Sequence, residues 1–154
     1  MPVYFFDSSA LVKRYVQETG TAWVLSICDP TASTGLYVAR IAGAEVVAAI
    51  ARQRRGGDLS ASDAESAIRQ FRLEFASVYR VVEITPALVL RAMDLAQTHA
   101  LRGYDAVQLA AALELNTLRL ARGMSVLTLV SADGELNAAA AVEGLPVEDP
   151  NAHP

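Results

Sequence analysis

The chain begins with an unbroken apolar run that ends at a carboxylate. Val3–Phe6 are four large apolar residues, and Asp7 follows them directly, ahead of two serines. An apolar run without alternation is typical of a strand covered on both faces, as in a parallel sheet. A second run, Ser125–Val130, leads to Asp133 in the same way. Because ligand sites of such sheets lie beyond the carboxyl ends of the strands, both carboxylates are candidates for one site.

Between these runs, apolar positions recur at the spacing of amphipathic helices. The spacing predicts helices over 10–16, 20–28, 38–53, 59–75 and 86–100, and a further helix from 104 onward. Ser62 and Glu65 form a capping-box pattern in the fourth of these helices. Short apolar segments predict strands over 33–37, 81–84 and 145–147. The alternation favours an α/β three-layer sandwich, with helices on both faces of a central parallel sheet of about five strands.

The composition favours one cytoplasmic domain over a membrane protein. Apolar residues make up 53% of the chain and the mean hydropathy is +0.27, but much of this is alanine, which favours helices. The longest apolar run, Val46–Ala51, is far shorter than the ~20 residues of a membrane span. The start of the chain lacks a signal-peptide pattern, and the single Cys28 cannot form an internal disulfide. We expect a single domain over 1–150 and a loose tail over 151–154.

Two further acids lie on predicted helices, where ordinary explanations compete with functional ones. Glu45 is the only charged residue within 41–51 and has apolar neighbours one turn away, so its burial needs a cation or a proton. Alternatively, its long side chain reaches solvent at the edge of the apolar stripe. Asp105 lies in the first turn of a helix, where the helix dipole favours any acid. In the same way, Asp7 or Ser8 would cap the helix that follows.

Together the four acids indicate a site for a hard metal ion. Asp7, Glu45, Asp105 and Asp133 offer only carboxylate oxygens, which suit Mg²⁺ or Mn²⁺. The two histidines are too far apart for a zinc site. The formal net charge is −4, from 13 basic and 17 acidic residues, so the acids outside this cluster equal the basic residues in number. The charge is therefore compatible with a nucleic-acid substrate that approaches through metal ions.

Five segments, spread over nearly the whole chain, carry a common pattern. In order they are Phe6-Asp7-Ser8-Ser9-Ala10-Leu11-Val12-Lys13, Glu45 in an alanine-rich helix, Tyr104-Asp105-Ala106-Val107-Gln108-Leu109-Ala110, Val130-Ser131-Ala132-Asp133-Gly134-Glu135-Leu136 and Leu145-Pro146-Val147-Glu148-Asp149-Pro150. Together they resemble the PIN-domain ribonucleases, and most closely the VapC-type toxins of bacterial toxin–antitoxin pairs. The family's hydroxyl positions fall on Ser8 and Ser131. The second predicted strand departs from the pattern, because Gly35-Leu36-Tyr37-Val38 replaces a small hydroxyl residue.

The resemblance implies a PIN-like fold and metal-dependent hydrolysis of RNA phosphodiester bonds. The family's three core acids fall on Asp7, Glu45 and Asp105, and its more variable fourth acid falls on Asp133. We therefore expect all four to be catalytic residues. Asp7, Asp105 and Asp133 would be ligands of Mg²⁺, for which Mn²⁺ would substitute. Glu45 would either bind the metal or deprotonate the attacking water.

Partners follow from the same resemblance. Four basic residues are candidates for contacts with RNA phosphates, although each is also explained as part of a solvated helix face: Lys13, Arg14, Arg40 and Arg102. We expect a homodimer that a cognate antitoxin silences by laying a helix in an apolar groove near the site. Leu11, Tyr15 and Trp23 are candidates for that groove, with ordinary core as the alternative for each. No membrane partner is expected.

Other functions are compatible with parts of this pattern. A PIN-domain RNA-processing nuclease without an antitoxin would carry the same acids. A non-catalytic PIN-like module that binds RNA or protein is disfavoured by the presence of all four acids. A phosphatase with Asp7 as its nucleophile would need a second aspartate two residues further on, where this chain has Ser9.

Overall fold

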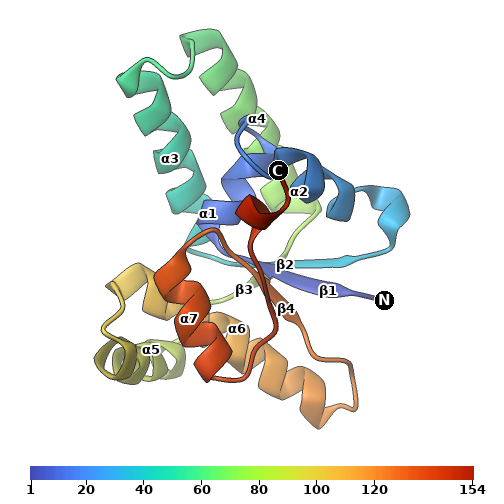
Figure 1. Ribbon diagram of the computed structural model, residues 1–154, viewed down its shortest axis with the longest axis vertical. Helices are drawn as coiled ribbons and strands as arrows, with labels where there is room; N and C mark the ends of the chain where they lie inside the picture. Colours follow the sequence, from blue (N-terminus) through green and yellow to red (C-terminus); the bar gives the residue numbers. More distant parts are fainter.

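Five short strands form a single parallel sheet in the order β3-β2-β1-β4-β5 (Figure 1). The computed structural model describes residues 1–154. The strands are β1 (Val3–Phe6), β2 (Gly35–Ala39), β3 (Arg80–Val82), β4 (Thr128–Val130) and β5 (Val147–Glu148). The helices are α1 (Ser8–Leu11), α2 (Thr21–Ile27), α3 (Ala42–Gly56), α4 (Ala61–Ser77), α5 (Pro86–His99), α6 (Gly103–Ala121) and α7 (Gly134–Val142). Three 3-10 turns cover Val12–Arg14, Pro30–Ala32 and Pro150–Ala152.

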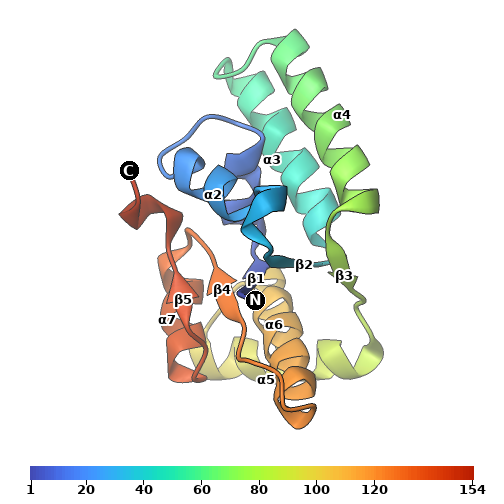
Figure 2. The ribbon, with the colours of Figure 1, turned by 90° about the vertical axis from the view of Figure 1, so that its right-hand side faces the viewer.

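Neighbouring residues of β1 belong to the two halves of the core, because side chains alternate between the faces of a sheet. Phe5 packs in a buried cluster with residues of α5, α6 and α7, among them Leu109. Phe6 packs in a second cluster with residues of α1 to α4, among them Ile50. Figures 1 and 2 show these two groups of helices on opposite faces of the sheet. The predicted α/β fold with a five-stranded parallel sheet is therefore confirmed. None of the helices combines the length and apolar character that crossing a membrane requires.

The boundary between the second strand and the third helix was predicted wrongly. The sequence pattern assigned Val38 and Ala39 to the helix, but both belong to β2 and pair with β3. Helix α3 begins only at Ala42 and ends at Gly56. An apolar stretch of this length is compatible with both structures, and pairing with a distant edge strand decides between them.

The predicted cap of one helix and the predicted bounds of three other elements also need correction. Helix α4 is capped by Ser60, whose hydroxyl accepts a hydrogen bond from the Asp63 amide at 3.0 Å, and not by the Ser62–Glu65 pair. The first helix is shorter than predicted, because α1 tightens into a 3-10 turn after Leu11. Strand β4 covers only the three residues that pair with β1, and β5 begins after Pro146.

The end of the chain is packed, and the prediction of a loose tail was wrong. Pro150–Ala152 forms a 3-10 turn, and the His153 ring stacks on Trp23 of α2 with ring centroids 4.4 Å apart and an interplanar angle of 4°. His153 also bonds Glu148 at 3.0 Å. Gly20 has a φ of 86°, and a Cβ there would lie 2.2 Å from the Pro150 carbonyl oxygen. The close approach of these two segments therefore depends on glycine at this position.

Candidate active site

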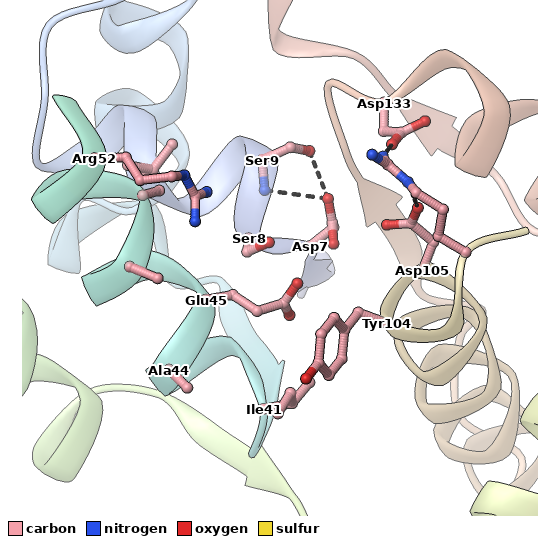
Figure 3. Close-up of a pocket in the computed structure, with 14 residues that line it drawn as sticks. Asp7, Ser8, Ser9, Ile41, Ala44, Glu45, Arg52, Tyr104, Asp105 and Asp133 are labelled. Carbon is pink, nitrogen blue, oxygen red and sulfur yellow. Dashed lines mark hydrogen bonds and ion pairs between the residues drawn. The ribbon is translucent and has the colours of Figure 1, made fainter. Parts of the chain in front are cut away.

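Four carboxylates line one cavity of about 460 Å³ at the carboxyl edge of the sheet (Figure 3). Asp7 follows β1 directly, and Asp133 follows β4 after a short loop. Glu45 lies in the first turn of α3 and Asp105 in the first turn of α6. The fold thus brings acids from four separate parts of the chain to the edge where a parallel sheet places its ligands.

Asp7 is held by the start of α1 and keeps one oxygen without a partner. Its Oδ2 accepts hydrogen bonds from the Ser9 amide at 3.1 Å and from the Ser9 hydroxyl at 2.5 Å. Its Oδ1 is buried and has no hydrogen-bond partner. Burial raises the pKa of Asp7, the bonds from Ser9 oppose this rise, and the charge of Asp105 adds to it. A cation or a proton would satisfy the free oxygen.

Glu45 lies in the cavity and is held by a buried amide of α6. The Gln108 Nε2 donates to its Oε1 at 2.6 Å, and the Gln108 side chain is fully buried. Burial raises the pKa of Glu45, the bond from Gln108 opposes the rise, and the charges of Asp7 and Asp105 add to it. The sequence analysis missed Gln108, although a lone amide three residues after Asp105 in an alanine-rich helix is a usable signal.

Asp105 and Asp133 share one arginine. The Arg102 Nε donates to Asp105 Oδ2 at 3.0 Å, and its Nη2 donates to Asp133 Oδ2 at 3.0 Å. Burial raises the pKa of Asp105, the bond from Arg102 opposes this rise, and the charge of Asp133 adds to it. The second oxygen of Asp133 caps α7 by accepting from the Glu135 and Leu136 amides at 2.9 and 3.1 Å.

A comparison with protein families identifies the family of this chain. The PIN-domain family model matches residues 4–142. The chain belongs to the PIN-domain family. Ribonuclease VapC45 from Mycobacterium tuberculosis (strain CDC 1551 / Oshkosh) is 36% identical over 88 residues, which cover 55% of this chain and 57% of that protein. The PIN domain is therefore a distant relative of VapC ribonucleases, and the alignment spans little more than half of this relative's length.

Solved structures share the PIN fold over almost the whole chain. PAE2754 from Pyrobaculum aerophilum has a TM-score of 0.65 at 19% identity, covering 99% of this chain and 86% of that chain. A toxin–antitoxin complex from Klebsiella pneumoniae has a TM-score of 0.60 at 19% identity, covering 96% of this chain and 97% of that chain. At such identities, the likeness supports the fold.

The hydroxyl groups beside the acids come from Ser8 and Ser131, as expected for their positions, and also from Ser9. Ser9, and not Ser8, bonds the Asp7 carboxylate, and its Oγ also accepts from the Ala132 amide at 3.0 Å. Ser8 lines the cavity, where its hydroxyl opposes the rise in the pKa of Glu45. Ser131 is fully buried and its Oγ accepts from the Asp133 amide at 3.1 Å. Ser9 therefore ties the start of α1 to the loop that carries Asp133.

Only one of the four basic residues selected from the sequence lines the cavity. Lys13 and Arg14 are engaged in ion pairs at 3.1 and 2.9 Å with acids of neighbouring segments. Arg40 forms an ion pair with an acid just beyond β3 on the protein surface. Arg102 does line the cavity, and so does Arg52 of α3, which the sequence analysis did not select. Arg52 is exposed and forms no ion pair.

The donor set suits a divalent cation, although the acids are not grouped around one. PIN nucleases generally depend on metal ions. Here, no three His, Cys, Asp or Glu side chains are arranged as a metal-holding group. The guanidinium of Arg102 lies instead between two of the four carboxylates. Carboxylate donors, a buried Asp7 oxygen without a partner, and acids whose pKa values are raised by burial all fit a bound Mg²⁺ or Mn²⁺.

Proposed function

We propose that this PIN-domain protein is a metal-dependent endoribonuclease. The observation that carries the proposal is the convergence of four carboxylates in one open cavity, where the buried Oδ1 of Asp7 has no hydrogen-bond partner. The partial match to Ribonuclease VapC45 supports the same chemistry. Mg²⁺ is the expected cation and Mn²⁺ a substitute, because both prefer oxygen ligands.

The four acids divide into ligands and a base. Asp7, Asp105 and Asp133 would hold the cation, directly or through water. When bound, such a cation offsets charge on the phosphate and lowers the pKa of a bound water. Glu45 would accept the proton of the attacking water inside the cavity, where the bond from Gln108 orients its carboxylate. Burial raises the pKa of Glu45, which makes it a better proton acceptor near neutral pH. Direct ligation of the cation is the alternative role.

RNA would enter over α3. Arg52 lies seven residues after Glu45, and residues seven apart share one face of a helix. Figure 3 shows Arg52 and Asp133 on opposite sides of Asp7. Because Arg102 is already bonded to two acids, Arg52 is the free positive charge at the cavity. We assign it a contact with an RNA phosphate next to the cleaved bond.

The test is cleavage of a fluorescent RNA by the purified full-length chain, with Mg²⁺ or with EDTA. Asp7→Asn should reduce cleavage to background, whereas Asp94→Asn, an exposed acid on α5, should leave it unchanged. Circular dichroism would show that both variants fold. Full activity of folded Asp7→Asn, or cleavage that persists in EDTA, would contradict the proposal. A generic phosphate ester as substrate separates a nuclease from a phosphatase.

We also propose that the protein is the toxin of a toxin–antitoxin pair. A groove of about 650 Å³ between α3 and α4 is lined by apolar residues, among them Val47, Ala51 and Phe75. Ala44 and Ala48 line both this groove and the acidic cavity. An amphipathic antitoxin helix in the groove would therefore lie beside the active site. The Klebsiella pneumoniae neighbour, which is a toxin–antitoxin complex, supports this partner. Leu11, earlier a candidate for the groove, is fully buried core.

A co-purification experiment tests the partner. A short reading frame beside this gene, co-expressed with the tagged chain, should co-purify with it and suppress RNA cleavage. Ala51→Glu in the groove should release the partner, whereas Ala87→Glu, an exposed position on α5, should retain it. Retention by both variants would exclude the groove as the docking site. Light scattering of the purified chain measures the homodimer, which stays a prediction.

One observation favours a second candidate, a non-catalytic PIN module that binds RNA. Arg102 bonds Asp105 and Asp133, so the acids do not form a metal-holding group in this arrangement. A module of this kind would bind RNA without cutting it, with or without Mg²⁺. The cleavage assay above separates the two candidates when RNA binding is followed in parallel.

A further inference from the structure

Arg102 occupies the position of a counter-ion in the acidic cavity. Its side chain is 76% exposed, yet two of its nitrogens bond different carboxylates at 3.0 Å each. Asp105 and Asp133 come from α6 and from the loop after β4, so the guanidinium links two separate elements across the cavity edge. Asp7 and Glu45, on the other side, have no cationic partner within ion-pair distance.

We propose that Arg102 is an internal counter-ion that competes with the divalent cation for Asp105 and Asp133. Cation binding would then require the arginine side chain to leave the two carboxylates. The inference rests on the proposed function only in assuming that these acids bind a divalent cation. It concerns the affinity of the site for that cation and is independent of RNA cleavage.

The geometry supports displacement over a permanent structural role. Both ion pairs are exposed on the arginine side, and exposed pairs are individually weak. A long side chain that is mostly in solvent can turn away without disturbing the core. Both bonds use Oδ2 atoms, while the Oδ1 of Asp133 continues to cap α7. The Asp133 carboxylate would therefore stay in place when the guanidinium leaves, because the amides at the start of α7 still hold it.

The proposal also explains how Asp105 and Asp133 remain next to each other without metal. Asp105 and Asp133 repel each other, and Arg102 neutralises that repulsion until a divalent cation replaces it. Once released, the guanidinium would remain at the cavity edge, where an RNA phosphate approaches. The same residue would then oppose cation binding in the free protein and favour substrate in the loaded one.

The test measures Mn²⁺ binding to the purified full-length chain without RNA, by calorimetry or by electron paramagnetic resonance of free Mn²⁺. Arg102→Gln should lower the Mn²⁺ dissociation constant by about tenfold, the combined effect of two exposed ion pairs. The matched control is Arg52→Gln, which removes the same charge from the same cavity without breaking an ion pair. Arg52→Gln should lower the Mn²⁺ dissociation constant by clearly less than Arg102→Gln does. The melting temperature of metal-free Arg102→Gln should fall, and its rise on adding Mn²⁺ should exceed that of the unmodified chain.

Three results would overturn the inference. The first is equal Mn²⁺ affinity in Arg102→Gln and the unmodified chain. The second is weaker Mn²⁺ affinity in Arg102→Gln, which would make Arg102 a residue that positions the acids. The third is no Mn²⁺ binding by either protein at millimolar concentration. Arg102→Lys keeps the charge but loses the planar fork. Its Mn²⁺ affinity should lie between those of the unmodified chain and Arg102→Gln. If Mn²⁺ binds as expected but RNA is not cut, the proposed nuclease function fails while this inference stands.

Discussion

Replacing Asp7 with asparagine should stabilise the metal-free protein at neutral pH while removing its activity. The Asp7 side chain is buried, and one of its oxygens has no partner, so its negative charge is held under unfavourable conditions. In Asp7→Asn the amide oxygen can accept both bonds that Ser9 now donates to Oδ2. Asparagine is also as good an N-cap as aspartate, so the start of α1 should survive. The variant loses the negative charge and places an amide NH2 group where the partnerless Oδ1 lies now.

The size of the effect follows from two opposing contributions. A buried charged group with an unsatisfied atom costs about 1–3 kcal/mol, of which asparagine recovers the part that depends on charge. The helix dipole stabilises a negative N-cap by about 0.3–1 kcal/mol, which asparagine forfeits. A net gain of about 1 kcal/mol in the free energy of unfolding corresponds to a rise of about 2–4 °C in melting temperature for a chain of this size. Scanning calorimetry in EDTA resolves such a change.

The pH dependence supplies the decisive control. Burial raises the pKa of Asp7 above its ordinary value of 3.8, so between the two values the folded chain binds more protons than the unfolded one. The stability that Asp7 contributes is therefore fully present below pH 3.8 and is lost as the pH rises through its folded pKa. The advantage of Asp7→Asn should grow over that range, while Asp94→Asn should show no such trend. A destabilised Asp7→Asn, or an advantage independent of pH, would refute the reasoning.

Three further predictions concern the same cavity. Mn²⁺ at about 100 times its dissociation constant should add about 2.7 kcal/mol to the free energy of unfolding, and a thermal scan that shows no shift would argue against a metal site. Arg52→Ala should raise the KM for RNA several-fold and reduce the slope of log affinity against log salt by about 0.7. Arg54→Ala should change neither quantity. Equal effects of the two variants would remove Arg52 from the RNA contact. Gln108→Leu should lower kcat by about tenfold with little change in KM, because Glu45 loses its orienting bond; steady-state kinetics with unchanged kcat would refute this role.

The sequence predicted the architecture and the place of the four acids because both depend on short, local patterns. An apolar run that stops at a carboxylate needs only its own residues to be recognised, as Val3–Phe6 with Asp7 illustrates. The parallel sheet then follows from the alternation of strands and helices. Glu45 was visible as a lone charge on an apolar helix face, and the structure places it in the cavity.

The missed residues depend on contacts between segments that are far apart in the chain. Gln108 acts on Glu45, which lies 63 positions away, and neither local sequence reveals the pairing. Arg14 looked free for RNA, but its ion-pair partner is Glu74 of α4, in a distant part of the chain. The tail looked loose because nothing near His153 indicates that it stacks on Trp23. Local sequence thus indicates which residues carry chemistry better than it indicates how their charges are balanced.

All four carboxylates lie at the N-terminal ends of helices. Each acid can therefore stabilise its helix and also belong to the proposed metal site. Asp7 and Asp133 are the N-caps of α1 and α7, while Glu45 and Asp105 lie in the first turns of α3 and α6. Helix N-termini favour negative charge by about 0.3–1 kcal/mol each, which offsets part of the mutual repulsion in the metal-free cavity.

The two oxygens of each capping aspartate divide these tasks. Oδ2 of Asp7 accepts from the backbone and hydroxyl of Ser9 while Oδ1 stays free. Oδ1 of Asp133 accepts from the backbone of α7 while Oδ2 faces the cavity and meets Arg102. The bond to the backbone fixes the carboxylate, and the remaining oxygen is presented in a fixed direction. A cation would therefore bind acids that are already oriented, so that little of its binding energy is needed to order them.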